Sequence, residues 1–195
     1  MKRIFEIIAS IALLLILSPV ILITGLLVRI FLGSPIIFFQ IRPGKDCKPF
    51  KLLKFRTMTN EHNEEGNLLP NEMRKTKFGK LLRSTSLDEL PELINIIKGD
   101  MSFVGPRPLR MEYIQHYTGN QIRRHEVKPG ITGWAQVNGR NAISFTERFK
   151  MDIWYVDNKS FLLNMKILFL TVIKVLKREN TEGELLNNKP FDGTN

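Results

Sequence analysis

The chain contains little of what builds a disulfide scaffold or a metal-binding cluster. Cys47 is its only cysteine, which excludes an internal disulfide and a multi-cysteine zinc site and is typical of a reducing compartment. The histidines His62, His116 and His125 are scattered, without the short spacing of a metal-binding helix. No internal repeat or low-complexity tract is visible. The 195 residues, 43% hydrophobic and 25% charged, predict one ordinary domain together with a membrane element.

Acidic residues are outnumbered, with 19 Asp and Glu against 29 Lys and Arg and a formal net charge of +10. This excess favours an anionic partner, which could be nucleic acid, phospholipid headgroups or a phosphorylated substrate. A nucleic-acid surface would show a basic stripe with interleaved aromatic residues. Here the basic residues occupy separate loops rich in Gly and Pro, so we expect no nucleic-acid partner.

Charge is absent from Ile7 to Val28, a run long enough to cross a hydrocarbon core as a helix. A cleaved signal peptide is disfavoured, because the run is too long and no small-x-small cleavage site follows it. A single-span anchor and a re-entrant hairpin both stay open at this point.

Ser18 and Pro19 lie near the middle of this run. Proline removes a backbone donor and clashes with the preceding turn, and Ser18 can bond a carbonyl that the break exposes. Each half is then about 20 Å long, too short to span alone. Because basic residues flank both ends, we expect both ends on the cytoplasmic face and a re-entrant helix-break-helix over residues 1–33.

The rest of the chain predicts an α+β fold that is mostly helical. Short apolar runs at 36–40 and 50–54, separated by RPGKDCKP, indicate a hairpin, and helices are expected near 78–83, 86–99, 110–117 and from 145 onward. We assign 34–180 to a small cytosolic catalytic domain and 181–195 to a C-terminal tail. The amphipathic segment 161–178 is either an interfacial helix with lysines toward headgroups or a core helix with a solvated face.

The most informative segment is STSLDELPELINIIK, residues 84–98. Ser86 and Glu89 fit a capping box, and Pro91 falls in the first turn, which predicts Asp88 and Glu89 at a helix N-terminus. An ionised aspartate there can attack phosphorus. The alternative is that these residues merely cap the helix.

Basic residues in Gly- and Pro-rich contexts accompany this carboxylate pair. Arginine offers paired donors that match phosphate oxygens, and flanking prolines fix such a residue in place. Together they predict a diphosphate site, formed by Lys54, Arg56, Arg83, Arg107 and Arg140.

The whole chain resembles the small monotopic phosphoglycosyl transferases, which form the bacterial sugar transferase family. The matching stretches are KRIF with the SP break, KFRTM, RSTSLDELPEL, GDMSFVGPRP, KPGITGWAQVNGRN and WYVDNKSF. Within the family, the likeness is greatest to enzymes that transfer N,N'-diacetylbacillosamine 1-phosphate in bacterial protein N-glycosylation, and it extends to NAISF and KPFDGTN.

The resemblance implies a two-step reaction at the cytoplasmic face of the bacterial inner membrane. Asp88 would attack the β-phosphorus of a UDP-sugar, UMP would leave, and undecaprenyl phosphate would take the phosphosugar. Asp88 and Glu89 would also bind Mg²⁺, and Ser18 with Pro19 would form the membrane break. Four residues would contact phosphate or nucleotide: Lys54, Arg83, Arg107 and Arg140.

The implied partners are the UDP-sugar, undecaprenyl phosphate, membrane lipids and downstream glycosyltransferases. Two alternatives remain: the same reaction on another UDP-hexose for exopolysaccharide or O-antigen, and a non-catalytic, membrane-anchored basic adaptor. Two residues depart from the family pattern. Glu92 stands where glutamine is common, which adds charge near the dyad, and Asn164 stands where an acidic residue is usual.

Overall fold

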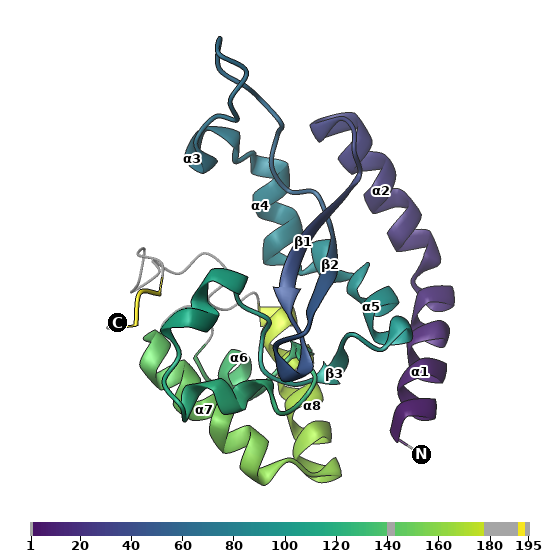
Figure 1. The fold of residues 1–195 in the computed structure, drawn as a ribbon. Coiled ribbons are helices and arrows are strands. Elements are labelled where there is room, and N and C mark those ends of the chain that lie inside the picture. The colour runs from purple at the N-terminus through teal and green to yellow at the C-terminus, as the bar shows by residue number, and fades with distance from the viewer. Residues whose placement is uncertain (1, 140–142, 178–190, 194–195) are drawn as a thin grey trace.

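The computed structural model describes residues 2–139, 143–177 and 191–193, arranged mostly as helices with two small sheets (Figure 1). The mostly helical α+β prediction is confirmed. The α-helices are α1 (Lys2–Ile16), α2 (Ser18–Leu32), α3 (Asn71–Arg74), α4 (Lys77–Ser84), α5 (Glu92–Lys98), α6 (Trp134–Asn138), α7 (Phe145–Asn158) and α8 (Phe161–Lys177). The strands are β1 (Ile37–Pro43), β2 (Pro49–Phe55), β3 (Ser102–Val104) and β4 (Gly130–Thr132). The 3-10 turns are η1 (Lys45–Cys47), η2 (Leu87–Glu89), η3 (Met111–His116) and η4 (Gln121–His125).

The first two helices form a bent pair along one side of the molecule (Figure 1). They meet at an angle of 64°, and Ser18 Oγ donates to the Leu15 carbonyl at 2.8 Å across the bend. Pro19 occupies the first turn of α2, where no N–H partner is needed. Among the described helices none is long and apolar enough to cross a membrane alone, whereas α1 and α2 together have the length and composition to do so.

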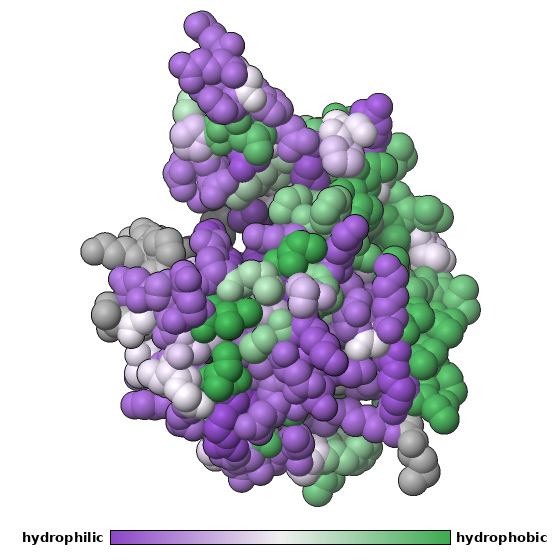
Figure 2. Space-filling view, viewed as in Figure 1, coloured by the Kyte–Doolittle hydropathy of each residue, from purple (hydrophilic) through white to green (hydrophobic). Residues whose placement is uncertain are grey.

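The two helices present an apolar surface to the outside, and they contact the rest of the chain through apolar side chains of α2, such as Val28, and through polar side chains of α1. Figure 2 shows that surface as a continuous green flank. On the inner side, Arg3 donates to the carbonyls of Ile96 and Ile97 at 2.5 and 2.6 Å, and Ser102 donates to Glu6. The α1 helix is therefore fastened to the C-terminal end of α5. The strongly exposed apolar side chains include Ile4, Phe5, Ile8, Leu15, Ile16, Leu22, Ile23, Leu26, Ile30 and Phe31.

The predicted hairpin is confirmed as an antiparallel pair of β1 and β2, in which Phe38 lies opposite Lys54. The connection is tight because Gly44 N–H donates to the Lys48 carbonyl at 2.8 Å. Along β2 the apolar side chains Phe50 and Leu52 are buried and pack in one cluster with residues of α5. Lys54 therefore reaches the region just before α5 from a strand that is anchored by its own core residues.

The C-terminal half contains a second hydrophobic cluster, which surrounds the parallel pair of strands β3 and β4. Helices α6 and α8 pack beside it, and Ile167 of α8 is fully buried. The helix predicted near 110–117 is present only as the 3-10 turn η3. Phe191 is buried in an aromatic cluster with Tyr113 and Phe149. The α8 helix also exposes Phe161, Leu162, Phe169, Val172 and Leu176.

Candidate active site

Asp88 and Glu89 lie on the short 3-10 turn η2, directly before α5. The predicted capping box is wrong: Ser86 has left-handed backbone angles (φ 57°, ψ 17°), and its side chain forms no cap hydrogen bond. The reason is that α4 ends at Ser84, so the chain must turn at once, and Ser86 makes this turn instead of holding the extended conformation that a cap requires. Pro91 is the N-cap residue of α5.

Glu89 is held by two cations from distant parts of the chain. Its Oε1 accepts from Lys54 Nζ at 2.6 Å and from Arg107 at 2.8 Å. Burial alone would raise the pKa of Glu89, but the charges of Arg107 and Lys54 outweigh burial and bring the pKa to about 2. Glu89 is therefore a permanent carboxylate at neutral pH, and it joins the hairpin to the loop after β3.

Asp88 is buried, with 7% of its surface exposed, yet its carboxylate accepts no hydrogen bond or ion pair from the described residues. Burial and the negative charge of Glu89 raise its pKa to about 6, although Lys54, Arg107 and Arg83 act in the opposite direction. At pH 7 most of the carboxylate is ionised. Asp88 is thus the member of the dyad whose oxygens are left for a ligand or for attack.

Glu92 forms a third carboxylate beside the dyad. Only 3% of the side chain is exposed, and its Oε1 lies 3.1 Å from Lys54 Nζ. Burial and the charge of Glu89 raise the pKa of Glu92 to about 7, with Lys54 and Arg107 opposing. The sequence predicts an additional carboxylate near the dyad. In the structure, the carboxylate of Glu92 lies beside Lys54, the same lysine that pairs with Glu89.

Two arginines lie near the dyad: Arg83 precedes it in the chain and Arg107 follows it. Arg83, at the end of α4, is exposed and donates to Thr57 Oγ1 at 3.0 Å, and its charge lowers the pKa of Asp88. Arg107 stands between two prolines after β3 and binds Glu89 directly. Lys54, Arg83 and Arg107 therefore surround the dyad, while the fourth predicted basic residue, Arg140, lies outside the described residues.

Arg56, which shares the KFRTM motif with Lys54, does not join the site. Its guanidinium is buried and donates to the carbonyls of Leu32 and Ser34, the latter at 2.9 Å. These groups follow the last turn of α2, where carbonyls lack helical partners. The prediction that Arg56 contacts phosphate is therefore wrong, because the side chain satisfies backbone acceptors at the end of a helix.

Two buried polar groups position the site and are missed by motif reasoning. Asn95 of α5 accepts from Leu53 N–H at 3.0 Å and donates to the Lys51 carbonyl at 2.7 Å, which fixes α5 against β2. Arg124 is paired with Asp152 at 2.7 Å and donates to the Arg107 carbonyl at 2.8 Å. The signal for Asn95 is a polar residue inside the apolar run LINII, because a buried amide needs partners.

The dyad fits the way in which proteins bind Mg²⁺. No cluster of three or more His, Cys, Asp or Glu side chains suited to a metal occurs in the part of the chain that the structure describes. Magnesium usually takes only one or two carboxylates, together with substrate phosphates and water. Asp88 has open oxygens, whereas the ion pairs of Glu89 occupy Oε1. Asp88 and Glu89 could therefore supply the protein's ligands to Mg²⁺, with phosphate oxygens of the substrate and water supplying the others.

Comparison with known proteins decides the family. The profile of the family described as bacterial sugar transferase matches residues 1–178, which is most of the chain. The chain belongs to the bacterial sugar transferase family. The prediction of a transferase enzyme is thereby confirmed.

Individual members of the family differ in length. The uncharacterized sugar transferase EpsL of Bacillus subtilis is 59% identical over 93% of this chain and 90% of its own length. The UDP-glucose:undecaprenyl-phosphate glucose-1-phosphate transferase of Klebsiella pneumoniae is 43% identical over 89% of this chain but only 39% of its own length. The exopolysaccharide production protein PSS of Rhizobium leguminosarum is 36% identical over 91% of this chain and 96% of its own.

Proposed function

We propose that this sugar transferase moves a sugar 1-phosphate from a UDP-sugar to undecaprenyl phosphate and releases UMP. The observation that carries the proposal is the dyad, in which Glu89 is neutralised by Lys54 and Arg107 while buried Asp88 keeps its carboxylate open. A nucleophile needs free oxygens, and a diphosphate needs cations around it. The name of the Klebsiella relative describes the same class of transfer.

In the first step, an Asp88 carboxylate oxygen bonds to the β-phosphorus. The bond from that phosphorus to the oxygen bridging to the α-phosphate breaks, and UMP leaves with that oxygen and its electron pair. Lys54, Arg83 and Arg107 are placed to stabilise charge on the phosphate oxygens, because arginine and lysine donors strengthen as negative charge develops on an acceptor. Bound Mg²⁺, held by Asp88 and Glu89, would supply further charge neutralisation at the diphosphate.

In the second step, a phosphate oxygen of undecaprenyl phosphate attacks the phosphorus of the Asp88 phosphosugar. The acyl phosphate bond breaks, the Asp88 carboxylate is restored, and the product is the undecaprenyl diphosphate sugar. Glu89 stays ionised throughout, because Arg107 and Lys54 hold its pKa low. Its part in this scheme is to hold the two cations, and the metal where present, beside the reacting phosphorus.

We propose an ordinary UDP-hexose as the sugar donor, with exopolysaccharide synthesis as the process, in preference to UDP-N,N'-diacetylbacillosamine and protein N-glycosylation. The relatives reported above carry names that refer to glucose 1-phosphate transfer and exopolysaccharide production, and none of those names refers to diacetylbacillosamine or N-glycosylation. UDP-glucose is therefore the first donor to test. Glycosyltransferases that extend a lipid-linked sugar would consume the product.

The bent helix pair supports a place at the cytoplasmic face of the bacterial inner membrane. The outer surface of α1 and α2 is apolar, while the polar side chains of α1 contact α5 and β3. Neither half alone is long enough to span a hydrocarbon core, so the pair would enter and return on one side. The open apolar side chains of α8 would lie in the same interface.

The decisive experiment is UMP release by the full chain in lipid nanodiscs, with Mg²⁺, undecaprenyl phosphate and a panel of UDP-sugars. Release with one donor, lost in Asp88→Asn, would support the reaction and identify the sugar. A folded wild-type protein that releases no UMP with any donor, and that binds anionic vesicles equally well with and without Asp88→Asn, would favour the adaptor alternative.

A further inference from the structure

A group of arginines continues away from the dyad beyond Arg107. Arg42 lies near the end of β1, Arg110 directly precedes η3, and Arg148 belongs to α7. Burial, and then the positive charges of Arg107 and Arg110, lower the pKa of Arg42 to about 10. Burial and Arg107 also lower the pKa of Arg148. Three chain segments, which are β1, the connection between β3 and η3, and α7, therefore bring four guanidinium groups close enough to repel one another.

Carboxylates offset only part of this charge: Glu112 acts on Arg42 and Asp152 acts on Arg148, each by less than Arg107. Arg107 shares Glu89 with Lys54, and the pair of Arg110 with Glu112 is long, at 3.5 Å, and exposed. Arg42 donates to Gln40, a neutral acceptor, at 2.7 Å. Its Nε is buried and has no hydrogen-bond partner among the described residues. Like charges in a half-buried place are unfavourable without a counterion, so this arrangement favours the binding of an anion.

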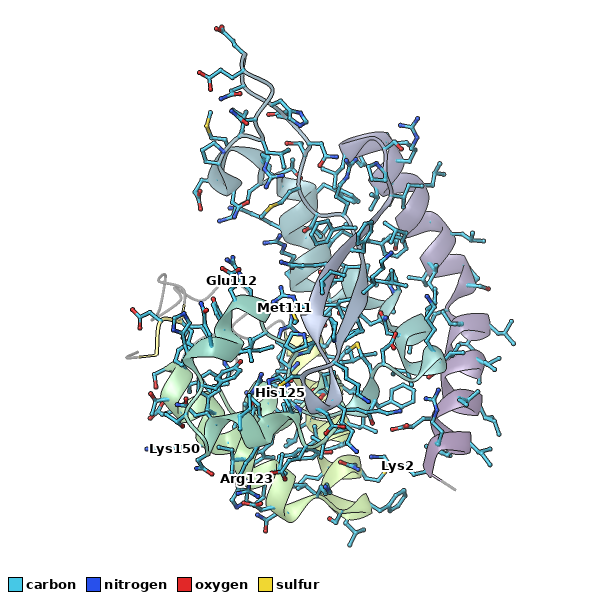
Figure 3. The ribbon with its side chains drawn as sticks, viewed as in Figure 1. Lys2, Met111, Glu112, Arg123, His125 and Lys150 are labelled. Atoms are coloured by element: carbon cyan, nitrogen blue, oxygen red, sulfur yellow. The ribbon has the colours of Figure 1, made fainter. Side chains whose placement is uncertain are left out.

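The surroundings leave access to these arginines. In Figure 3, Met111 and Glu112 mark η3, which faces the hairpin, and in Figure 2 the surface is indented between η3 and α4. Arg110 is exposed and Arg42 is half-buried, so a ligand can reach both from solvent.

The structural arginine Arg124 differs from Arg42 and Arg110 in its hydrogen bonds. Arg124 is 2% exposed, and its guanidinium contacts Asp152, the Arg107 carbonyl and Tyr117. That set of acceptors satisfies a buried guanidinium. Among the described residues, Arg42 and Arg110 have no such set of acceptors, so their guanidinium groups, unlike that of Arg124, retain donors for a ligand.

We propose that Arg42 and Arg110 form a second phosphate subsite, which shares Arg107 with the dyad and binds a phosphate monoester. The proposal rests on the proposed function, which brings two such groups to the site. One is the α-phosphate that leaves as UMP, and the other is the phosphate of the polyprenyl acceptor. Arginine suits either ligand, because its planar fork can pair with two phosphate oxygens.

The test measures binding without turnover, in full-length Asp88→Asn protein in nanodiscs. Dissociation constants for UMP and for undecaprenyl phosphate are compared between this parent and versions that also carry Arg42→Gln or Arg110→Gln. The matched control is Arg123→Gln, an exposed arginine of η4 that pairs with Glu126 and Asp157. Loss of a charge-assisted hydrogen bond predicts roughly tenfold weaker binding of one ligand, with no change in the control.

Weaker UMP binding in both variants would assign the subsite to the nucleotide, and weaker undecaprenyl phosphate binding would assign it to the acceptor. Arg42→Lys, which keeps the charge but not the fork, should lose less. If both glutamine variants melt like the parent and bind both ligands within twofold of it, the proposal is overturned. That result, with UMP release intact in the wild type, would leave the proposed function standing.

Discussion

Lys54 and Glu89 are 35 positions apart in the chain, yet the Lys54 ammonium lies 2.6 Å from a carboxylate oxygen of Glu89. The same ammonium lies 3.1 Å from Glu92. One lysine of the hairpin therefore stands between two carboxylates, one on η2 and one on the first turn of α5. This arrangement ties the position of Asp88 to the hairpin, because Asp88 and Glu89 share a single short turn.

Replacing Lys54 by methionine should harm both activity and stability. Glu89 and Glu92 would face each other with one cation fewer, and removing a charged partner costs about 1.5–3 kcal/mol. We expect UMP release to fall at least tenfold, together with a lower denaturant midpoint. Lys51→Met is the matched control, because Lys51 is exposed on the same strand and its side chain, among the described residues, contacts the ring of Phe39 and no carboxylate. Equal losses in the two variants would contradict this role for Lys54.

The rate of UMP release should fall in acid. Asp88 attacks only as a carboxylate, and burial with the charge of Glu89 raises its pKa to about 6. The ionised fraction is therefore nearly complete above pH 7 and drops about tenfold for each pH unit well below 6. Glu89, with a pKa of about 2, does not titrate in this window. Single-turnover release between pH 5 and 8, at concentrations of Mg²⁺ and donor well below saturation, measures the profile of the free enzyme. A flat profile would argue against Asp88 as the titrating nucleophile.

Glu92→Gln should stabilise the protein at alkaline pH. Burial raises the pKa of Glu92 to about 7, so the folded state favours its protonated form. The stability that Glu92 contributes is then fully present below pH 4.5 and is lost as the pH rises through 7. Glutamine does not titrate, so the variant should gain on the wild type between pH 5 and 8, by up to about 3 kcal/mol. Denaturant midpoints at several pH values test this, and a constant difference would refute it.

The parts of the fold that local chemistry dictates could be predicted from the sequence. Pro19 cannot continue the hydrogen bonds of a helix interior, so a bend at that point follows from one residue. The hairpin follows from two apolar runs around a turn-rich connection, and the end of α5 follows from Gly99, which adopts φ 97°. The two prolines that flank Arg107 predict a fixed loop, whereas its expected place beside the dyad came from the group of basic residues and from the family resemblance.

The parts of the site that the sequence did not predict depend on contacts between residues that are far apart in the chain. Ser86 and Glu89 match a capping box, but α4 ends two residues before Ser86, and Glu89 finds stronger partners in two cations. Lys54 and Arg56 are two residues apart in one motif, yet only Lys54 lies within the strand that faces the dyad. Arg56 follows the strand and meets the end of α2, which no local pattern indicates.

Arg3 should matter more for stability than its neighbour Lys2. Arg3 donates to two carbonyls at the end of α5, whereas Lys2 is exposed and lies 3.9 Å from Glu6. Arg3→Ala should lower stability by about 1.5–3 kcal/mol, since two charge-assisted bonds are lost. Lys2→Ala should cost at most about 1 kcal/mol, as for an exposed ion pair. Thermal unfolding in nanodiscs compares them, and similar melting temperatures would show that Arg3 does not anchor α1.

The direction in which the bent helix pair meets the membrane can be tested by cysteine labelling. Cys47→Ser removes the only cysteine, and Lys2→Cys or Lys45→Cys then places a single thiol at the first residue of α1 or after α2. Because the 64° bend leaves each half too short to span, both thiols should lie on the cytoplasmic face. An impermeant maleimide should therefore label neither in intact cells and both after lysis. Labelling of one thiol in intact cells would show that the segment crosses the membrane. Labelling at position 2 would leave the catalytic residues on the cytoplasmic side, whereas labelling at position 45 would place them on the opposite side.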